Sequence, residues 1–493
     1  MVPPHSVSGR MKRGAMRGIS TLARPLVAAL RSGVRAPFLA GMACLALAFA
    51  VLGGSLVLRP APLRAEAEGA GSLRAHMGVA SCAGSTCHGR SVASGTPVRQ
   101  DELLRWQEES SPTGAHSRAW RVVGEPRGQA IARRLGLDSA GTVRECAGCH
   151  ASQGAARLAD GVDCEACHGA SGAGAGGGWL AAHYTVGTSH ARNVAQGMTD
   201  LTSPRVRAGV CLDCHLSGDG QGQFIAHRIM AAGHPRISFE LDLFSTLQQH
   251  HDEDADYVTR KGHKTNSMQM WAIGQAEAVK RGLALYSQPA KANDGVFPEF
   301  TFYDCHSCHR RIYDGDEANV SAVPNPGRPI HAGMPPYNDE NIILLLAAAR
   351  VVAPGEAATF DARSKAFHRA MGVGRSETVA AAQALRQAAD ALSARFAATA
   401  FNRDQAFTVI DTIASDAISE RFTDYEGSVQ SVMALDTLLN GMVNAGMVSA
   451  GGASGLRLQI NQAYAAVRDP NGFQPIAFRR AFGSAVRSIR SLR

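Results

Sequence analysis

Five short motifs in this chain each pair two cysteines with a histidine that directly follows the second cysteine. Four have the spacing C-x-x-C-H, and the first has four residues between its cysteines. Such a pair can add its sulfurs to the vinyl groups of a haem, while the histidine binds the iron. The attaching cysteines are Cys82, Cys87, Cys146, Cys149, Cys164, Cys167, Cys211, Cys214, Cys305 and Cys308. The motifs predict five covalently attached haem c groups, with His88, His150, His168, His215 and His309 as proximal ligands.

A zinc site and a disulfide framework are the two other interpretations of these cysteines. A zinc site also uses Cys and His at short spacing, but it seldom places a histidine directly after each cysteine pair. A disulfide framework also uses an even number of cysteines, yet it gives no reason for the recurring histidine. For the wider motif of Cys82 and Cys87, a disulfide or a haem held by one thioether stays open.

Each iron needs a sixth ligand, and a second histidine there gives an inert site suited to electron transfer. His116 and His190 share a His-x-Arg setting, and both are predicted distal ligands, with His183 as the nearest alternative to His190. His227 and His234 are seven residues apart, so a helix would place both on one face, although Gly233 suggests that the helix ends before His234. His331 is a further candidate. His250, His251 and His263 are expected to be solvated or hydrogen-bonded, and His76 and His368 to lie at the surface.

The second and third motifs lie almost end to end, from Cys146 to His168. Two haem attachment sites this close along the chain predict two haems in contact. We therefore expect this stretch to carry a stacked pair within a five-haem array.

The N-terminus has the pattern of an export signal. Residues 1–36 carry seven Lys or Arg and no acid, and residues 37–58 form an uncharged apolar run that contains Cys44. The run is long enough to span a bilayer, with its basic flank in the cytoplasm. We expect a periplasmic protein, either soluble after cleavage near Ala67 or anchored to the membrane by residues 37–58.

The positive charge of the chain belongs to this leader. The whole chain has a formal charge of +8, and residues 1–67 hold nine Lys or Arg against the single acid Glu66. The remaining chain is formally neutral, and haem propionates would make it acidic. The basic pI therefore gives no reason to expect binding to nucleic acid.

The sequence predicts a mainly α protein with two parts after the leader. Residues 68–310 are loop-rich, with short helices and little strand, and hold all five motifs. Residues 311–339 form a connection rich in Pro, Gly and Asn. Residues 340–493 show apolar residues at helical spacing and predict an antiparallel helical domain. Its helices are expected near 340–353, 376–397, 403–417, 425–447, 455–467 and 473–491.

Several stretches between residues 78 and 310 resemble the cytochrome c-554-like multihaem family. They are TDLTSP (199–204), RAGVCLDCH (207–215), AGHPR (232–236), FEL (239–241) and WAIGQ (271–275). The resemblance implies bis-histidine haems in stacked pairs, a periplasmic electron-transfer role, relatives such as hydroxylamine oxidoreductase, and His234 as a ligand. The chain departs from the family in its wider first motif, and in having five sites where the cytochrome that names the family has four.

These observations favour an electron carrier that passes electrons between redox partner proteins through closely packed haems. The alternative is an oxidoreductase in which one iron lacks a distal histidine and binds a small nitrogen or sulfur compound. A third possibility is a subunit of a larger membrane redox complex. No catalytic residue stands out in the sequence.

Overall fold

The structure is a computed structural model that describes residues 76–93, 99–152, 157–172, 178–185, 187–250, 265–309, 327–331, 333–418 and 425–493. Residues 65–493 form one compact unit. The predicted leader, with its apolar run at 37–58, lies outside the described residues, as does most of the connection at 311–339. Among the described helices, none is both long enough and apolar enough to cross a membrane.

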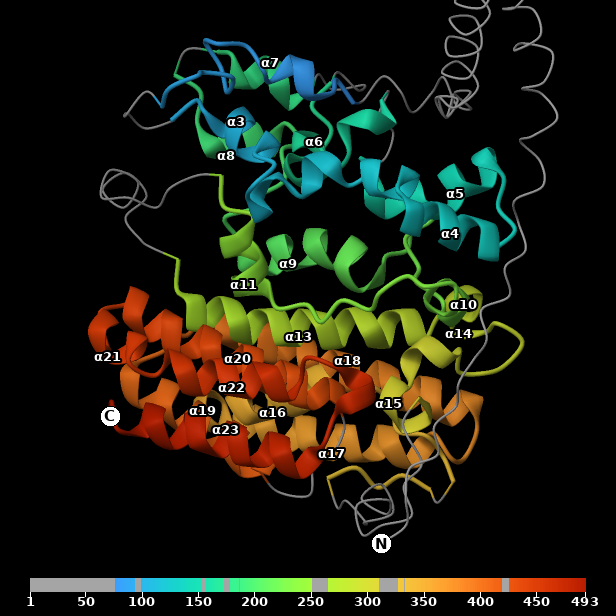
Figure 1. Ribbon diagram of the computed structural model, residues 1–493, viewed down its shortest axis with the longest axis vertical. Helices are drawn as coiled ribbons and strands as arrows, with labels where there is room; N and C mark the ends of the chain where they lie inside the picture. The colour runs from blue at the N-terminus through green and yellow to red at the C-terminus, as the bar shows by residue number, and fades with distance from the viewer. Residues whose placement is uncertain are drawn as a thin grey trace, which may run out of the picture. The chain divides into compact units, whose positions relative to one another are not determined.

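The predicted mainly α fold class is confirmed. Regular structure in the described part of the chain is helical, apart from an isolated antiparallel bridge between Tyr303 and Tyr337. The helices fall into a set of short ones that carry the motifs and a set of long ones that follow (Figure 1).

Side chains cap the N-termini of several of the short helices. Asp138 caps α5, Asp163 caps α6 and Ser203 caps α9, in each case by accepting backbone N–H groups of the first turn. These helices are α3 (Glu102–Gln107), α4 (Pro126–Arg134), α5 (Ser139–His150), α6 (Cys164–His168), α7 (Trp179–His183), α8 (His190–Ala195), α9 (Pro204–Leu212), α10 (His227–Ala231), α11 (Leu241–Leu247), α14 (Pro289–Ala292) and α15 (Cys305–Cys308).

A long buried helix, α13 (Ser267–Tyr286), lies between the two sets (Figure 1). Asn266 caps its N-terminus. Apolar or small residues lie on nearly all of its sides, which is typical of a core helix rather than a surface helix. It packs against α9 and α11 on the motif side and against α16, α18 and α20 on the other. This helix has no counterpart among the elements predicted from the sequence.

The C-terminal segment forms the predicted helices with small shifts at their ends. They are α16 (Glu340–Val352), α18 (Arg375–Ala397), α19 (Arg403–Ile418), α20 (Tyr425–Asn444), α22 (Arg457–Ala466) and α23 (Pro475–Arg490). The short helix α21 (Ala450–Ser454) was not predicted. An additional helix that was not predicted, α17 (Pro354–Ala370), packs along α18. Pro354 at its first turn marks its start, because proline tolerates that position.

One apolar core runs through the long helices, from Met268 on α13 to Ile489 on α23. The boundary predicted near residue 310 therefore does not divide the core, since α13 precedes it in sequence. Polar contacts also join the motif segment to the long helices. Gln430 Nε2 donates to the Phe239 carbonyl at 3.0 Å, and the Thr437 hydroxyl donates to Glu240 at 2.8 Å.

Candidate functional site

Each histidine that closes a motif faces a second histidine from another part of the chain. The ring centroids of the facing pairs are 6.0–6.3 Å apart. We number the sites 1 to 5 in chain order by their motifs. The pairs are His88 with His183 at site 1, His150 with His234 at site 2, His168 with His250 at site 3, His215 with His116 at site 4, and His309 with His227 at site 5.

This separation fits an iron ion held between two imidazoles. Two metal–nitrogen bonds of about 2 Å each, together with the half-widths of two rings, span roughly 6 Å. Aromatic rings in direct contact also have centroids about 4.5–7 Å apart, so the case for a metal depends on the recurrence of this spacing beside all five cysteine pairs. The spacing therefore leaves room for one metal ion in each pair, and the cysteines for attaching a haem stand beside it.

The protonation of the rings suits ligation, because only neutral imidazole binds a metal. Burial lowers the pKa of His116, His150, His183 and His234. Burial also lowers the pKa of His215, to about 4, with a smaller contribution from the facing His116. These five imidazoles are thus favoured in the neutral form at neutral pH.

Hydrogen bonds to Nδ1 orient several of the rings and leave Nε2 for a metal. His150 Nδ1 is 2.8 Å from the Ala119 carbonyl, and His234 Nδ1 is 2.9 Å from the Pro235 carbonyl. His250 Nδ1 lies 3.0 Å from the Gln248 carbonyl. A carbonyl only accepts, so each of these nitrogens carries the proton.

Site 1 has a charged acceptor instead of a carbonyl. His88 Nδ1 lies 3.0 Å from Glu102 Oε2, and the Glu102 side chain is 7% exposed. This hydrogen bond holds the pKa of His88 above its ordinary value, against the effect of burial. On the other face of the site, the side-chain amide of Asn193 lies 3.1 Å from His183 Nδ1.

Site 4 lacks such a partner. The buried Nδ1 of His215 makes no hydrogen bond within the described structure. Its ring is held by aromatic packing: Phe239 stacks on it at 5.7 Å and Phe244 meets it edge-on at 4.8 Å between centroids. The proximal ring of site 1 therefore contacts a charged carboxylate, whereas the proximal ring of site 4 contacts uncharged aromatic rings.

The motif sulfurs join sites that are distant along the chain. Cys149 of site 2 lies beside Cys214 of site 4, and Cys214 Sγ is 3.7 Å from the carbonyl of Gly148 inside the second motif. Cys82 of site 1 lies beside Cys164 of site 3. These contacts pair site 1 with site 3 and site 2 with site 4, whereas the sequence analysis paired the adjacent motifs of Cys146–His168.

Three of the five predicted distal histidines face a motif histidine. They are His116, His227 and His234, of which His227 begins α10 and His234 follows it. The position of His234 after a helix end at Gly233 agrees with the sequence interpretation, since Gly233 has a φ of 115° that favours glycine.

The other two predicted distal histidines lie elsewhere. His190 Nε2 is 3.0 Å from Asp200 Oδ1, in a partly exposed ion pair at the start of α8. His331 packs against the backbone at Gly372, where an added Cβ would come within 2.0 Å of the imidazole. Neither faces a motif histidine within the described structure, so we replace both as ligand candidates.

One facing histidine, His250, was not predicted as a ligand, and another, His183, was only the alternative to His190. His183 closes α7 and His250 follows α11, and they face His88 and His168. His250 had been read as solvated because of the charged residues after it. His76 and His368 had been expected at the surface, but their side chains are 9% and 0% exposed. No local signal distinguishes His183 from His190, since both end or begin a short helix beside polar residues.

Comparisons with known proteins bear on the first three sites. Residues 81–169 match the family described as cytochrome c554 and c-prime. This confirms the resemblance to a cytochrome c554-like family for that segment, although the stretches at 199–275 that first indicated it lie outside the match. The match supports a c-type cytochrome with covalently bound haem c and a role in electron transfer. No curated protein and no solved structure matches the chain significantly.

Proposed function

From the premise that residues 81–169 resemble cytochrome c554 and c-prime, we propose that the chain is a five-haem c-type cytochrome that transfers electrons between redox partners. Bound haem c supplies a one-electron iron couple at each site. The protein supplies the attachment, the axial imidazoles and the surroundings that set each reduction potential. The match covers three of the five motifs, so the full count rests on the geometry of the chain.

The facing histidine pairs carry this proposal. A second imidazole lies about 6 Å from the histidine of each of the five motifs. A metal ion bound between the two rings explains why this arrangement recurs at every motif. We assign His183, His234, His250, His116 and His227 as the distal ligands of sites 1 to 5 in that order.

The contacts between sites support a path for electrons. Cys82 joins site 1 to site 3, and Cys149 joins site 2 to site 4. Cys167 of site 3 lies close enough to Cys214 of site 4 for Cys214 to add to the effect of burial in raising the pKa of Cys167. His234 of site 2 and His227 of site 5 lie at the two ends of one short segment around α10. We propose the order 1–3–4–2–5.

An electron carrier accounts for this arrangement better than an enzyme does. An enzyme of this kind needs an iron with one open position, which in turn needs a motif histidine without a facing partner. The pairing of all five motif histidines favours inert, six-coordinate iron throughout. The proposal of an oxidoreductase acting on a small nitrogen or sulfur compound has no comparable support.

The place of the protein in the cell follows from the leader and from the chemistry of attachment. We propose that the basic segment and apolar run at 37–58 direct export to the periplasm, with the run either removed near Ala67 or kept as an anchor. The redox partners, and assembly into a membrane complex, are proposed on the electron-carrier role alone.

Haem number and spin state test the proposal together. Intact mass spectrometry of protein matured in a periplasm should show five covalent haems, and electron paramagnetic resonance of the oxidised protein should show low-spin iron only. Four haems would remove the wide motif of Cys82 and Cys87 from the array. One high-spin iron per chain would overturn the pure carrier, and zinc without haem would overturn the proposal as a whole.

A further inference from the structure

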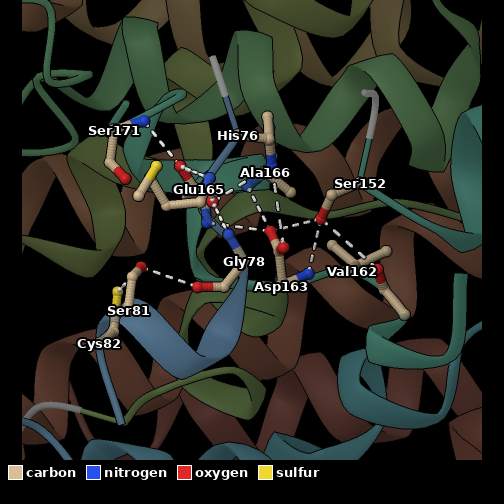
Figure 2. Close-up of polar contacts among 12 residues, drawn as sticks. His76, Gly78, Ser81, Cys82, Ser152, Val162, Asp163, Glu165, Ala166 and Ser171 are labelled. Atoms are coloured by element: carbon tan, nitrogen blue, oxygen red, sulfur yellow. Dashed lines mark hydrogen bonds and ion pairs between the residues drawn. The ribbon is translucent and has the colours of Figure 1, made fainter. Parts of the chain in front are cut away.

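A buried cluster of His76, Asp163 and Glu165 lies outside the five histidine pairs (Figure 2). His76 Nδ1 is 3.3 Å from Glu165 Oε2 and 3.9 Å from Asp163 Oδ2. The three side chains are 9%, 1% and 1% exposed. Their ligand-type atoms all lie within 4.8 Å of one another.

Asp163 is oriented so that one oxygen is saturated and the other is not. Oδ1 accepts hydrogen bonds from the Ser152 hydroxyl and from the backbone N–H groups of Glu165 and Ala166. Oδ2 is buried, makes no hydrogen bond within the described structure and lies toward His76. A buried carboxylate oxygen with no hydrogen bond, and only an imidazole 3.9 Å away, is costly, so this atom indicates that a positively charged ligand belongs there.

Backbone N–H groups fix both oxygens of Glu165, including Oε2, which faces His76 and accepts from Met77 and Gly78 (Figure 2). Its carboxylate accepts from the N–H groups of Met77, Gly78 and Ser171 at 2.6–3.1 Å. Burial opposes its ionisation, but the nearby His76 and the hydrogen bonds from Ser171 and Met77 bring its pKa down to about 2. Both carboxylates are therefore held in place by groups other than His76, as ligands of a preorganised metal site are.

The charge of the cluster also calls for a cation. Two buried carboxylates face a single imidazole. A third carboxylate, Asp160, lies nearby: burial and then the charge of Asp163 raise its pKa, although Arg157 acts in the opposite direction. Even a protonated His76 leaves the cluster with a net negative charge. A divalent cation bound by neutral His76 and the two carboxylates would bring the three-residue cluster to zero.

We propose that His76 Nδ1, Asp163 Oδ2 and Glu165 Oε2 bind a divalent first-row transition cation, with Zn²⁺ as the representative ion. Donor atoms 3.3 and 3.9 Å apart can share an ion at about 2 Å from each. An imidazole together with two carboxylates suits zinc, manganese or iron(II), whereas calcium and magnesium prefer oxygen donors alone. The inference concerns neither the haem count nor the axial ligands.

The position of the cluster gives the ion a structural task. Glu165 lies inside the third motif, between Cys164 and Cys167, and Asp163 caps the same helix, α6. His76 precedes the first motif, whose Cys82 lies beside Cys164. An ion at this point would tie the segment that leads into site 1 to the helix that carries site 3.

Zinc titration of the haem-loaded, full-length protein tests this site. After chelator treatment and dialysis, calorimetry and elemental analysis should show one Zn²⁺ per chain, and His76→Gln should weaken binding at least tenfold. His190→Gln is the matched control, because His190 makes a 3.0 Å contact with a single carboxylate, Asp200, at a partly exposed position. That variant should bind zinc as the parent does.

The opposing outcomes are equally distinct. Absence of stoichiometric zinc, or equal affinity in the His76→Gln variant, overturns the site. If the variant loses haem, zinc-edge X-ray absorption of the parent protein decides instead: one imidazole with oxygen neighbours supports the site, and a sulfur shell refutes it. Neither result depends on whether the haems are five in number, so this test and that of the proposed function fail separately.

Discussion

His183 faces His88 with ring centroids 6.1 Å apart and ring planes inclined by only 16°. His190, seven residues later, contacts Asp200 instead. Both histidines have a plausible local setting for a haem ligand, and the fold brings only one of them to the first motif. The difference between them is a direct test of the ligand assignment.

Replacing His183 by alanine should leave one iron of the array five-coordinate and high-spin, because no other described histidine faces His88. Electron paramagnetic resonance should then show one high-spin iron per chain, with the haem count unchanged. His190→Ala is the control and should leave all signals low-spin. Low-spin spectra for the His183 variant, or a high-spin signal in the His190 variant, would reverse the assignment.

The Glu102 carboxylate should lower the reduction potential of site 1, because a charged acceptor makes the ligating imidazole more basic and favours ferric iron. Glu102→Gln keeps a hydrogen bond but removes the charge. If the variant stabilises ferric iron by about 1 kcal/mol less, the reduction potential of this one-electron couple at site 1 rises by roughly 40 mV. Glu109→Gln removes an equal charge from an exposed ion pair with Arg121 and should shift nothing in a spectroelectrochemical titration.

Glu240 should make the fold less stable as pH rises. Burial, followed by the charge of Asp242, raises its pKa from an ordinary 4.5 to about 7. The folded chain then binds more protons at this group than the unfolded chain between pH 4.5 and 7, so its contribution to stability falls as pH rises through that window. The free energy of unfolding falls by at most about 3 kcal/mol through this group.

Glu240→Gln should flatten this dependence, because the amide has no proton to lose. Thermal unfolding followed by circular dichroism at pH 5 and pH 8 measures it. The melting temperature of the variant should rise relative to that of the parent at pH 8 but not at pH 5. A parallel shift at both values would show that the glutamine merely disturbs the hydrogen bonds to Asp242, Leu243 and Thr437.

Gly274 lets α13 and α11 approach closely. A Cβ at this position would lie 2.6 Å from the Cβ of Leu241. Gly274→Ala should therefore destabilise the protein by about 1–3 kcal/mol, as an overpacked core does. Gly355→Ala in α17 is the control, since nothing lies within 4 Å of the added atom, and it should change the melting temperature little or raise it. Equal melting temperatures for both variants would contradict the tight contact.

The proximal half of each site could be read from the sequence because its chemistry is local. A cysteine pair and the histidine after it act within about one turn of chain, so composition and spacing are enough to name Cys146, Cys149 and His150. The long C-terminal helices were readable for a similar reason, since their apolar residues repeat at three and four positions.

The distal half of each site depends on tertiary placement and was only partly predictable. His250 precedes a charged run that suggests solvent, yet its ring faces His168. α13 was missed because apolar or small residues lie on nearly all its sides, so it lacks the one-sided pattern that predicts an amphipathic helix. In both cases the deciding contacts come from residues far away in the chain.

The facing histidines of each pair are 82 to 99 residues apart along the chain. In the export proposed above, which starts from the N-terminus, the motifs of sites 1, 2 and 3 would emerge well before His183, His234 and His250, whereas sites 4 and 5 would find His116 and His227 already across. Maturation would thus pass through a stage in which the first three sites carry one histidine each. Closure of the array is then a late, long-range event, which makes the half-exported chain the stage most exposed to misligation.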